Sequence, residues 1–432
     1  MLKRKKNITS LILSVVMTAS LSGAMSTYVS AASSRLAGLD RYETSAAISN
    51  SGWTTSDYVV IANGEDYPDA LSASPLAKKY NAPILLTSAG ALDKNAKKEI
   101  ERLKPSHAFI IGGNASVSKA AAQEISSLIP NVQRLGGLDR YETSVDVAKA
   151  LGTVSKIVLT SGNGFADALS IAPVAGKESM PILLTEKDKL PDKVKEYLDG
   201  VKDSIEESYV VGGVGVINEG VASKLPTEAV RLSGDDRYET NVEVMTYFSD
   251  KIDFSNLYVV KGDGLNGKAF ADALSGSALA AKNSSPIVLT DGIVPKNTES
   301  FMKFVLGEDS NFIALGGEAV VPQGIITKLE EMKVEKVNLV KQITEEVQKF
   351  VNQVNAKIPE LATDNEKKVV TKLIDSLSKG ISDPNYDLTS ELDEYNKLYE
   401  QLTDEEKQDI SNKLAGIDIG KLQSLLQQAG VL

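Results

Sequence analysis

Three copies of one polar motif supply the side chains in this sequence that are best suited to chemistry. The motif reads Arg-Leu-x-Gly-x-Asp-Arg-Tyr-Glu-Thr, and its copies begin at Arg35, Arg134 and Arg231. Its second arginine offers a planar guanidinium that suits carboxylates and phosphates. A separate aspartate follows this arginine by 28, 27 and 35 residues, in an aromatic-x-Asp-Ala-Leu-Ser motif. The candidate site residues are Arg41, Arg140 and Arg237; Tyr42, Tyr141 and Tyr238; and Asp69, Asp167 and Asp272.

Each of these residues also has a structural interpretation. Asp40 and Glu43, and the same pair in the other copies, have the spacing of a capping box at a helix start. An arginine in a first helical turn opposes the helix macrodipole, so it needs a partner. That partner is either the separate aspartate, within a repeat or across a boundary between repeats, or an anionic polymer. The aspartate can instead cap the next helix, and the tyrosine either stacks on a sugar ring or packs into the core.

The segments between these motifs predict parallel α/β units. In the first copy, residues 58–62, 84–87 and 109–111 are continuous apolar runs, which are typical of strands buried on both faces. Residues 70–80 and 94–103 have apolar residues at helical spacing. This alternation predicts three small doubly wound domains, Rossmann- or flavodoxin-like. The polar motifs then fall at the carboxyl ends of strands, where such sheets bind ligands.

A Gly-Gly pair follows the third strand of each copy, at residues 112–113, 212–213 and 316–317. Two interpretations are open. The glycines permit a tight turn into the next helix, or they form a loop that cradles a phosphate. Neither the Lys-Ser/Thr of a P-loop nor a Gly-x-Gly-x-x-Gly accompanies them, which favours the turn.

The sequence predicts five segments. Residues 1–32 read as a signal peptide, with four basic residues, an apolar stretch and a small-residue cleavage site, so no membrane span is expected after cleavage. Residues 33–132, 133–229 and 230–340 are repeats 1, 2 and 3, and residues 341–432 are a helical domain of unknown role. Repeat 1 has Pro68 where the others have alanine, and repeat 3 has an insertion whose loop, 265–268, should protrude. Repeat 3 lacks an Arg-Leu-x-Gly sequel, and we expect residues 337–340 to form the missing strand.

The composition excludes several functions. The chain has no cysteine and one histidine, His107, so neither thiol chemistry, a histidine–cysteine zinc site nor a Ser-His-Asp triad in each repeat is supported. We expect no metal and no cofactor. The formal net charge of −11 provides no positive field for nucleic acid or an anionic membrane. A glycosidase that uses two carboxylates remains as an alternative, because it needs only two Asp or Glu residues.

The four ordered motifs, in three tandem copies after a signal peptide, resemble the clostridial cell wall binding repeat, type 2. The resemblance covers nearly 300 of the 432 residues. It implies a pseudo-threefold arrangement within one chain and a secreted, non-enzymatic surface protein of the Gram-positive cell wall. It also implies non-covalent binding of an anionic, teichoic-acid-like wall polysaccharide in grooves between repeats, to which the motif arginines and aspartates contribute. The family includes S-layer components, so other S-layer proteins are candidate partners.

The last ninety residues have a different pattern. Apolar stripes at helical spacing cover 343–358, 369–377 and 388–402, and Thr363 with Glu366 and Thr403 with Glu406 read as capping boxes. The sequence therefore predicts an acidic all-α helical bundle.

Overall fold

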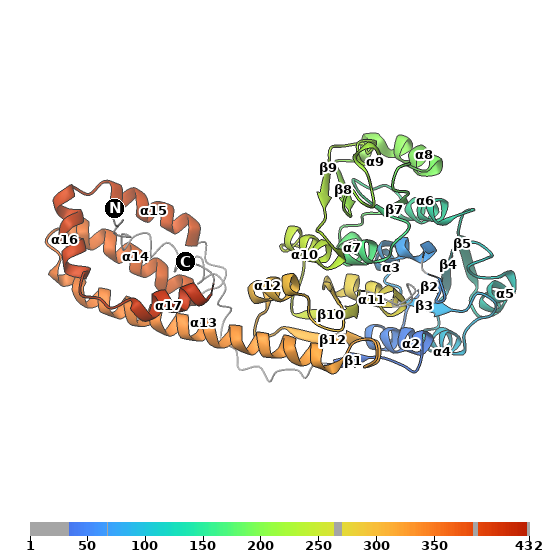
Figure 1. Cartoon of the computed structure of the whole chain (residues 1–432), viewed down its shortest axis with the longest axis horizontal. Coiled ribbons are helices and arrows are strands. Elements are labelled where there is room, and N and C mark those ends of the chain that lie inside the picture. The colour runs from blue at the N-terminus through green and yellow to red at the C-terminus, as the bar shows by residue number, and fades with distance from the viewer. Residues whose placement is uncertain (1–33, 67, 263–269, 383–387, 430–432) are drawn as a thin grey trace. The chain divides into compact units, whose positions relative to one another are not determined.

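The computed structural model describes residues 34–66, 68–262, 270–382 and 388–429 (Figure 1). The predicted signal peptide and the predicted loop at 265–268 lie outside these residues. The chain divides into two compact units, one that ends at Met332 and one that begins at Lys333. None of the helices in the described ranges is long and apolar enough to cross a bilayer.

The first unit contains three four-stranded sheets in which all strands are parallel. The strand orders are β3-β2-β4-β5, β7-β6-β8-β9 and β11-β10-β12-β1. The first sheet contains β2 (Tyr58–Asn63), β3 (Ile84–Thr87), β4 (His107–Ile111) and β5 (Asn131–Leu135). The second contains β6 (Lys156–Ser161), β7 (Ile182–Thr185), β8 (Glu207–Val211) and β9 (Ala229–Leu232). The third contains β10 (Asn256–Lys261), β11 (Ile287–Thr290), β12 (Asn311–Leu315) and β1 (Ser34–Leu36).

Helices alternate with these strands, as the apolar pattern predicts. Repeat 1 contains α2 (Arg41–Gly52), the 3-10 helix η1 (Pro68–Ser72), α3 (Ala73–Lys79), α4 (Lys94–Leu103) and α5 (Lys119–Leu128). Repeat 2 contains α6 (Arg140–Leu151), α7 (Ala166–Lys177), α8 (Asp192–Val201), η2 (Lys202–Ser204) and α9 (Glu219–Ala222). Repeat 3 contains α10 (Arg237–Tyr247), α11 (Phe270–Asn283) and α12 (Lys296–Val305). The predicted α/β class is confirmed.

The edge strand of each sheet comes from the start of a motif copy. β5 carries Arg134-Leu135 and β9 carries Arg231-Leu232, so the first two sheets borrow their edge strand from the next copy. The third sheet borrows β1 from the start of the first copy, with Leu36 opposite Leu315. The prediction that residues 337–340 form this strand is wrong, because they lie in the helix α13 (Gln323–Lys357). The strand exchange closes the three repeats into a ring.

The second unit is helical, as predicted. Its elements are the C-terminal part of α13, η4 (Ile358–Glu360), α14 (Asp364–Ser382), α15 (Leu388–Glu400), α16 (Asp404–Leu414) and α17 (Gly420–Gln428). Val354, Leu377 and Leu426 lie at the centre of its apolar core. Both predicted capping boxes are confirmed, since Thr363 and Glu366, and likewise Thr403 and Glu406, exchange hydrogen bonds.

Candidate functional site: the boundaries between repeats

The motif aspartate in front of each arginine caps a helix. Asp40 accepts hydrogen bonds from the backbone N–H groups of Tyr42 and Glu43, at 2.9 and 2.8 Å, at the start of α2. Asp139 and Asp236 do the same for α6 and α10. The glutamate does not complete a capping box as predicted. Glu43 instead accepts from the N–H of Leu39, one residue before the cap. Gly38 makes this approach possible, because a Cβ atom there would overlap with Cβ of Glu43.

Each motif arginine is anchored in its own repeat. Arg140 Nη1 donates to the carbonyl of Gly162 at 2.5 Å, and Arg237 Nη1 donates to that of Gly262 at 2.8 Å. Arg41 donates in the same way to Gly64. These glycines directly follow the central strands β2, β6 and β10. The anchor fixes one nitrogen of the guanidinium at the carboxyl end of the sheet.

The motif tyrosines pack against the same glycines. A Cβ atom on Gly162 would lie 2.6 Å from Cε1 of Tyr141, and one on Gly64 would lie 2.8 Å from Cε1 of Tyr42. Both rings are half-buried, and so is that of Tyr238. Burial raises the pKa of Tyr141, and burial together with Glu65 raises that of Tyr42 to about 12. Packing explains why glycine stands at these positions, and sugar stacking on the remaining ring surface stays a prediction.

The separate aspartates lie against the Gly-Gly turns. Gly112, Gly212 and Gly316 have positive φ angles of 98°, 123° and 102°, which favour glycine. A Cβ on Gly212 would also lie 2.8 Å from Oδ2 of Asp167. These glycines therefore permit both the turn and the close approach of a carboxylate. The alternative that Asp167 caps the following helix is wrong, because it lies inside the first turn of α7, whose cap position is Phe165.

Arginine and aspartate meet across the boundaries between repeats. The charge of Arg237 in repeat 3 acts on Asp167 in repeat 2, and that of Arg41 in repeat 1 acts on Asp272 in repeat 3. Burial raises the pKa of both carboxyl groups to about 6, and the arginine opposes part of this rise in each case. The direct contacts of Arg237 within the described residues are with the carbonyl of Gly262 and the ring of Phe165, not with Asp167. At the boundary between repeats 1 and 2, Asp69 instead accepts a hydrogen bond from Ser116 of its own repeat, and among the described residues no hydrogen bond or ion pair joins it to Arg140.

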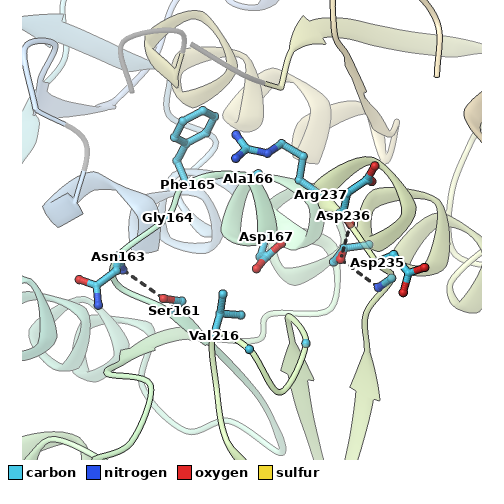
Figure 2. A pocket seen from close by; sticks show the side chains of 14 residues that line it. Ser161, Asn163, Gly164, Phe165, Ala166, Asp167, Val216, Asp235, Asp236 and Arg237 are labelled. Atoms are coloured by element: carbon cyan, nitrogen blue, oxygen red, sulfur yellow. Dashed lines mark hydrogen bonds between the residues drawn. The ribbon is translucent and has the colours of Figure 1, made fainter. Parts of the chain in front are cut away.

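Arg237 and Asp167 both line a pocket of about 570 Å³ (Figure 2). Figure 2 shows Asp167 in the middle of the pocket wall and Asn163 and Ser161 on one side of it. The guanidinium carbon of Arg237 lies 5.9 Å from the centre of the Phe165 ring. Gly213, Gly215 and the loop that precedes Arg237 complete the lining. The pocket therefore lies on the boundary between repeats 2 and 3, and both repeats build it.

Three local sources contribute positive potential to this pocket, against the three carboxyl groups of Asp167, Asp235 and Asp236 on its lining. Arg237 provides one full charge, and its single hydrogen bond within the described chain leaves four N–H groups for a ligand. The N-termini of α7 and α10 meet at the pocket, and α7 begins without a side-chain cap. Asp235 and Asp236 are acidic neighbours, of which Asp236 is engaged as the cap of α10.

The three boundaries are not identical. Asp235 corresponds to Leu39 and Leu138, whose side chains are 97% and 94% exposed. Pro68 begins a 3-10 helix in repeat 1, where repeats 2 and 3 have regular α-helices. Side chains at the rim and the direction of backbone N–H groups therefore differ from one boundary to the next.

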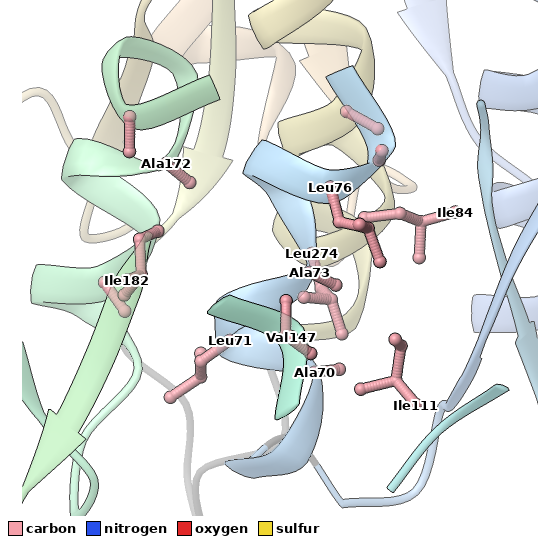
Figure 3. Close-up of a cluster of buried hydrophobic side chains, with 14 of the residues drawn as sticks. Ala70, Leu71, Ala73, Leu76, Ile84, Ile111, Val147, Ala172, Ile182 and Leu274 are labelled. Carbon is pink, nitrogen blue, oxygen red and sulfur yellow. The ribbon is translucent and has the colours of Figure 1, made fainter. Parts of the chain in front are cut away.

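Packing around the pseudo-threefold axis holds these boundaries in place. α3, α7 and α11 lie at the centre of the first unit and contact one another (Figure 1). Ser74 Oγ lies 3.3 and 3.2 Å from the carbonyl oxygens of Ala172 and Ser277, which belong to the other two repeats. Figure 3 shows Val147 of repeat 2 beside Leu71 and Ala70 of repeat 1. The apolar core is thus continuous across the repeats.

Three lysines that the motif analysis missed also join the repeats. Lys79 donates to the carbonyl of Leu151 at 2.9 Å, Lys177 to that of Lys251 at 2.5 Å, and Lys282 to that of Gly52 at 2.7 Å. Each of these boundary lysines donates to a carbonyl of the next repeat. The carbonyl lies at or just beyond the C-terminal end of the first helix of that repeat, and the negative end of the helix dipole there favours a cation. The sequence does contain their signal, since a lysine lies four residues before the proline of each Pro-Ile-(Leu/Val)-Leu-Thr motif.

The three α/β repeats form a closed ring, and a motif arginine lies at each boundary between them. This arrangement is that of a protein built from repeated binding modules. Within the described residues, no group of three or more His, Asp or Glu side chains is arranged to hold a metal ion. A family model, described as Cell wall binding domain 2 (CWB2), matches residues 35–122, 134–222 and 231–326. The chain belongs to this family, as its motifs indicate.

Relatives and solved structures agree with this assignment. The chain is 34% identical over 299 residues to N-acetylmuramoyl-L-alanine amidase LytC of Bacillus subtilis. The matched region is 68% of this chain and 58% of that protein. It is 35% identical over 276 residues to the amidase enhancer of the same organism. That matched region is 63% of this chain and 37% of the amidase enhancer. Cwp6 and Cwp8 from Clostridium difficile superpose with TM-scores of 0.61 and 0.63, at 35% and 30% identity. They cover 68% and 71% of this chain, which in turn spans only about half of each of them.

Proposed function

We propose that the three repeats attach this protein non-covalently to an anionic, teichoic-acid-like polysaccharide of a Gram-positive cell wall. Membership of a cell wall binding family supports a location at the wall or cell surface. The observation that carries the finer proposal is the pocket of about 570 Å³ that Asp167 and Arg237 both line. It presents a guanidinium with unused donors at a place that two repeats share.

An anionic group of the polymer would bind between Arg237 and the N-terminus of α7. A phosphate there accepts from the planar guanidinium and from backbone N–H groups of an uncapped helix. The ring of Phe165 restricts the guanidinium on one side. Arg41 with Asp272 and Arg140 with Asp69 would supply the two related positions, with affinities that differ because their rims differ.

The three positions need not bind tightly one by one. Linked sites on a repeating polymer gain avidity of roughly 10² to 10⁴ over one site. We propose that the wall-bound ring displays the helical segment 341–432 at the surface, in association with an S-layer. The proposal keeps the segment boundaries predicted from the sequence: a signal peptide over 1–32, repeats over 33–132, 133–229 and 230–340, and a helical domain over 341–432.

The test is co-sedimentation of the mature protein with purified wall that carries the polymer and with the same wall stripped of it. We expect retention only on the first. Replacing Arg41, Arg140 and Arg237 together by alanine should release the protein without changing its circular dichroism spectrum. A control variant with Lys189, Lys193 and Lys195 replaced by alanine loses the same charge from an exposed surface and should stay bound. Full sedimentation of the triple arginine variant would contradict the proposal.

The same preparation tests the hydrolase alternative. The name of one relative, an amidase, is a reason to measure whether sugars or peptides are released from the wall. Release by the mature protein would support an enzyme that uses the repeats for targeting. Retention without release supports a binding protein.

A further inference from the structure

A second pocket, of about 590 Å³, lies within repeat 2 at the ends of α6 and α8. It shares no lining residue with the boundary pocket. Its walls include Gly152 and Thr153, which follow α6, and Gly200 near the end of α8, with Lys149 and Asp203 also on the lining. It is therefore a separate place on the molecule, formed by one repeat.

Repeat 1 fills the corresponding space with one of its own side chains. α4 and α8 both have ten residues, and their ninth residues are Arg102 and Gly200. Arg102 Nη1 donates to the carbonyl oxygens of Trp53 and Thr54 at 2.8 and 3.1 Å. These are the two residues that follow α2. Glu99, the sixth residue of α4, holds the other edge of the guanidinium at 2.6 Å.

Repeat 2 keeps the acceptors but lacks the guanidinium. Gly152 and Thr153 correspond to Trp53 and Thr54, and no described residue donates a hydrogen bond to either carbonyl. Lys79 occupies only the preceding carbonyls, those of Ala150 and Leu151. A Cβ atom on Gly200 would meet nothing within 4 Å, so the space is open.

The remaining lining favours a cation. Tyr197 stands in place of Glu99 and is among the lining residues, although the residue is only 8% exposed. Its hydroxyl has no hydrogen-bond partner among the described residues. Asp203 adds a carboxylate, and the C-terminus of α6 contributes negative potential that offsets the nearby Lys149. The pocket therefore offers two carbonyl acceptors, those of Gly152 and Thr153, and the carboxylate of Asp203, a set that suits a cationic donor.

We propose that this pocket binds the guanidinium group of an arginine side chain from another peptide or protein chain. Its N–H groups would donate to the carbonyl oxygens of Gly152 and Thr153, as those of Arg102 do to Trp53 and Thr54. A guanidinium suits the site better than an ammonium, because its planar fork reaches two successive carbonyls at once. The site belongs to repeat 2, since repeat 3 has Phe301 and Phe304 at the sixth and ninth positions of α12.

The probe is the peptide acetyl-Gly-Arg-Gly-amide, added to the full mature chain and followed by amide NMR. We expect saturable shifts at Gly152, Thr153 and Gly200, with a dissociation constant on the order of 1 mM for so small a ligand. The same peptide with citrulline in place of arginine keeps the shape without the charge and should bind at least tenfold more weakly. Equal binding of the two peptides, or no saturable shift, would overturn the proposal.

Two variants provide a matched comparison. Gly200→Arg should restore the two hydrogen bonds that Arg102 makes to backbone carbonyls in repeat 1, raise the melting temperature and abolish binding of the peptide. Gly200→Ala raises helix propensity without filling the pocket, so it should keep binding. If Gly200→Arg binds the peptide as well as Gly200→Ala does, the guanidinium does not occupy this pocket. Because the boundary pocket is elsewhere, wall retention of both variants should stay unchanged.

Discussion

Asp167 is held in a place that disfavours its charge, and replacing it by asparagine should stabilise the protein at neutral pH. The carboxyl lies against the turn at Gly212, and burial raises its pKa from 3.8 to about 6 although Arg237 is nearby. Asparagine has nearly the same shape and no charge to desolvate. The change therefore removes an electrostatic cost while it keeps the packing.

The size of the effect follows from the difference in pKa. One pKa unit corresponds to about 1.4 kcal/mol, so a rise of roughly two units costs about 3 kcal/mol when the group is ionised in both states. The folded protein binds the proton more tightly than the unfolded chain, so stability falls as the pH rises from near 4 to above 6. Asp167→Asn should therefore raise the free energy of unfolding by about 3 kcal/mol at pH 7.5 and by only about 0.5 kcal/mol at pH 4.

The assay is urea unfolding of the protein and the variant at both pH values, with the loss of the circular dichroism signal as the readout. All other carboxyl groups are common to the two proteins, so their titration cancels in the difference. A difference of equal size at pH 4 and pH 7.5 would refute the reasoning, because the cost would not then come from ionisation. A destabilised variant at pH 7.5 would show that the carboxylate is stabilised by its surroundings.

Three further predictions concern the ring and its boundaries. Wall retention should strengthen as the pH falls through 6, because the two carboxyl groups with raised pKa lose their charge beside the arginines; retention that is flat between pH 5 and 8 would contradict this. Replacing the three boundary lysines together by methionine should lower the free energy of unfolding, measured in urea, by about 3 kcal/mol. Each lost hydrogen bond to a helix end contributes roughly 1 kcal/mol. An unchanged midpoint of urea unfolding would show that these contacts are not needed for stability. Gly212→Ala should destabilise the folded protein by more than about 1 kcal/mol, because the φ of Gly212 is +123° and a Cβ atom there would meet Asp167. Gly213→Ala is the control, since a Cβ atom at Gly213 would have no neighbour closer than 4.0 Å. Equal melting temperatures for the two variants would contradict this prediction.

The α/β class of the first unit could be predicted because its signals are local. Continuous apolar runs such as that of β2 and the Gly-Gly turns are repeated three times, so each copy supports the others. The aspartate caps are also local, since Asp40 acts on N–H groups only two and three residues away. The predicted hydrogen-bond partner of Glu43 was wrong by one residue, because the position of this side chain depends on its close packing against Gly38, which spacing alone does not reveal.

Pairings between repeats could not be predicted from the motifs. The motif places Arg237 and Asp272 in the same copy, yet each acts on a partner in another copy. The sequence does not specify which of three similar neighbours a side chain meets, because all copies offer the same residue types. The closing strand was missed for the same reason. Ser34–Leu36 has the composition of β5 and β9, but its partner β12 is almost 280 residues away in the chain.

The closing strand has a consequence for binding. The arginine and the aspartate of a boundary come from different copies, so an isolated repeat would carry only half of any boundary. Three repeats in an open chain would form two boundaries. Pairing of β1 with β12 brings Arg41 beside Asp272 and adds the third. For a repeating polymer, the number of linked positions determines avidity. The exchange of one short strand therefore completes the fold and, in the proposed function, adds a position for the polymer.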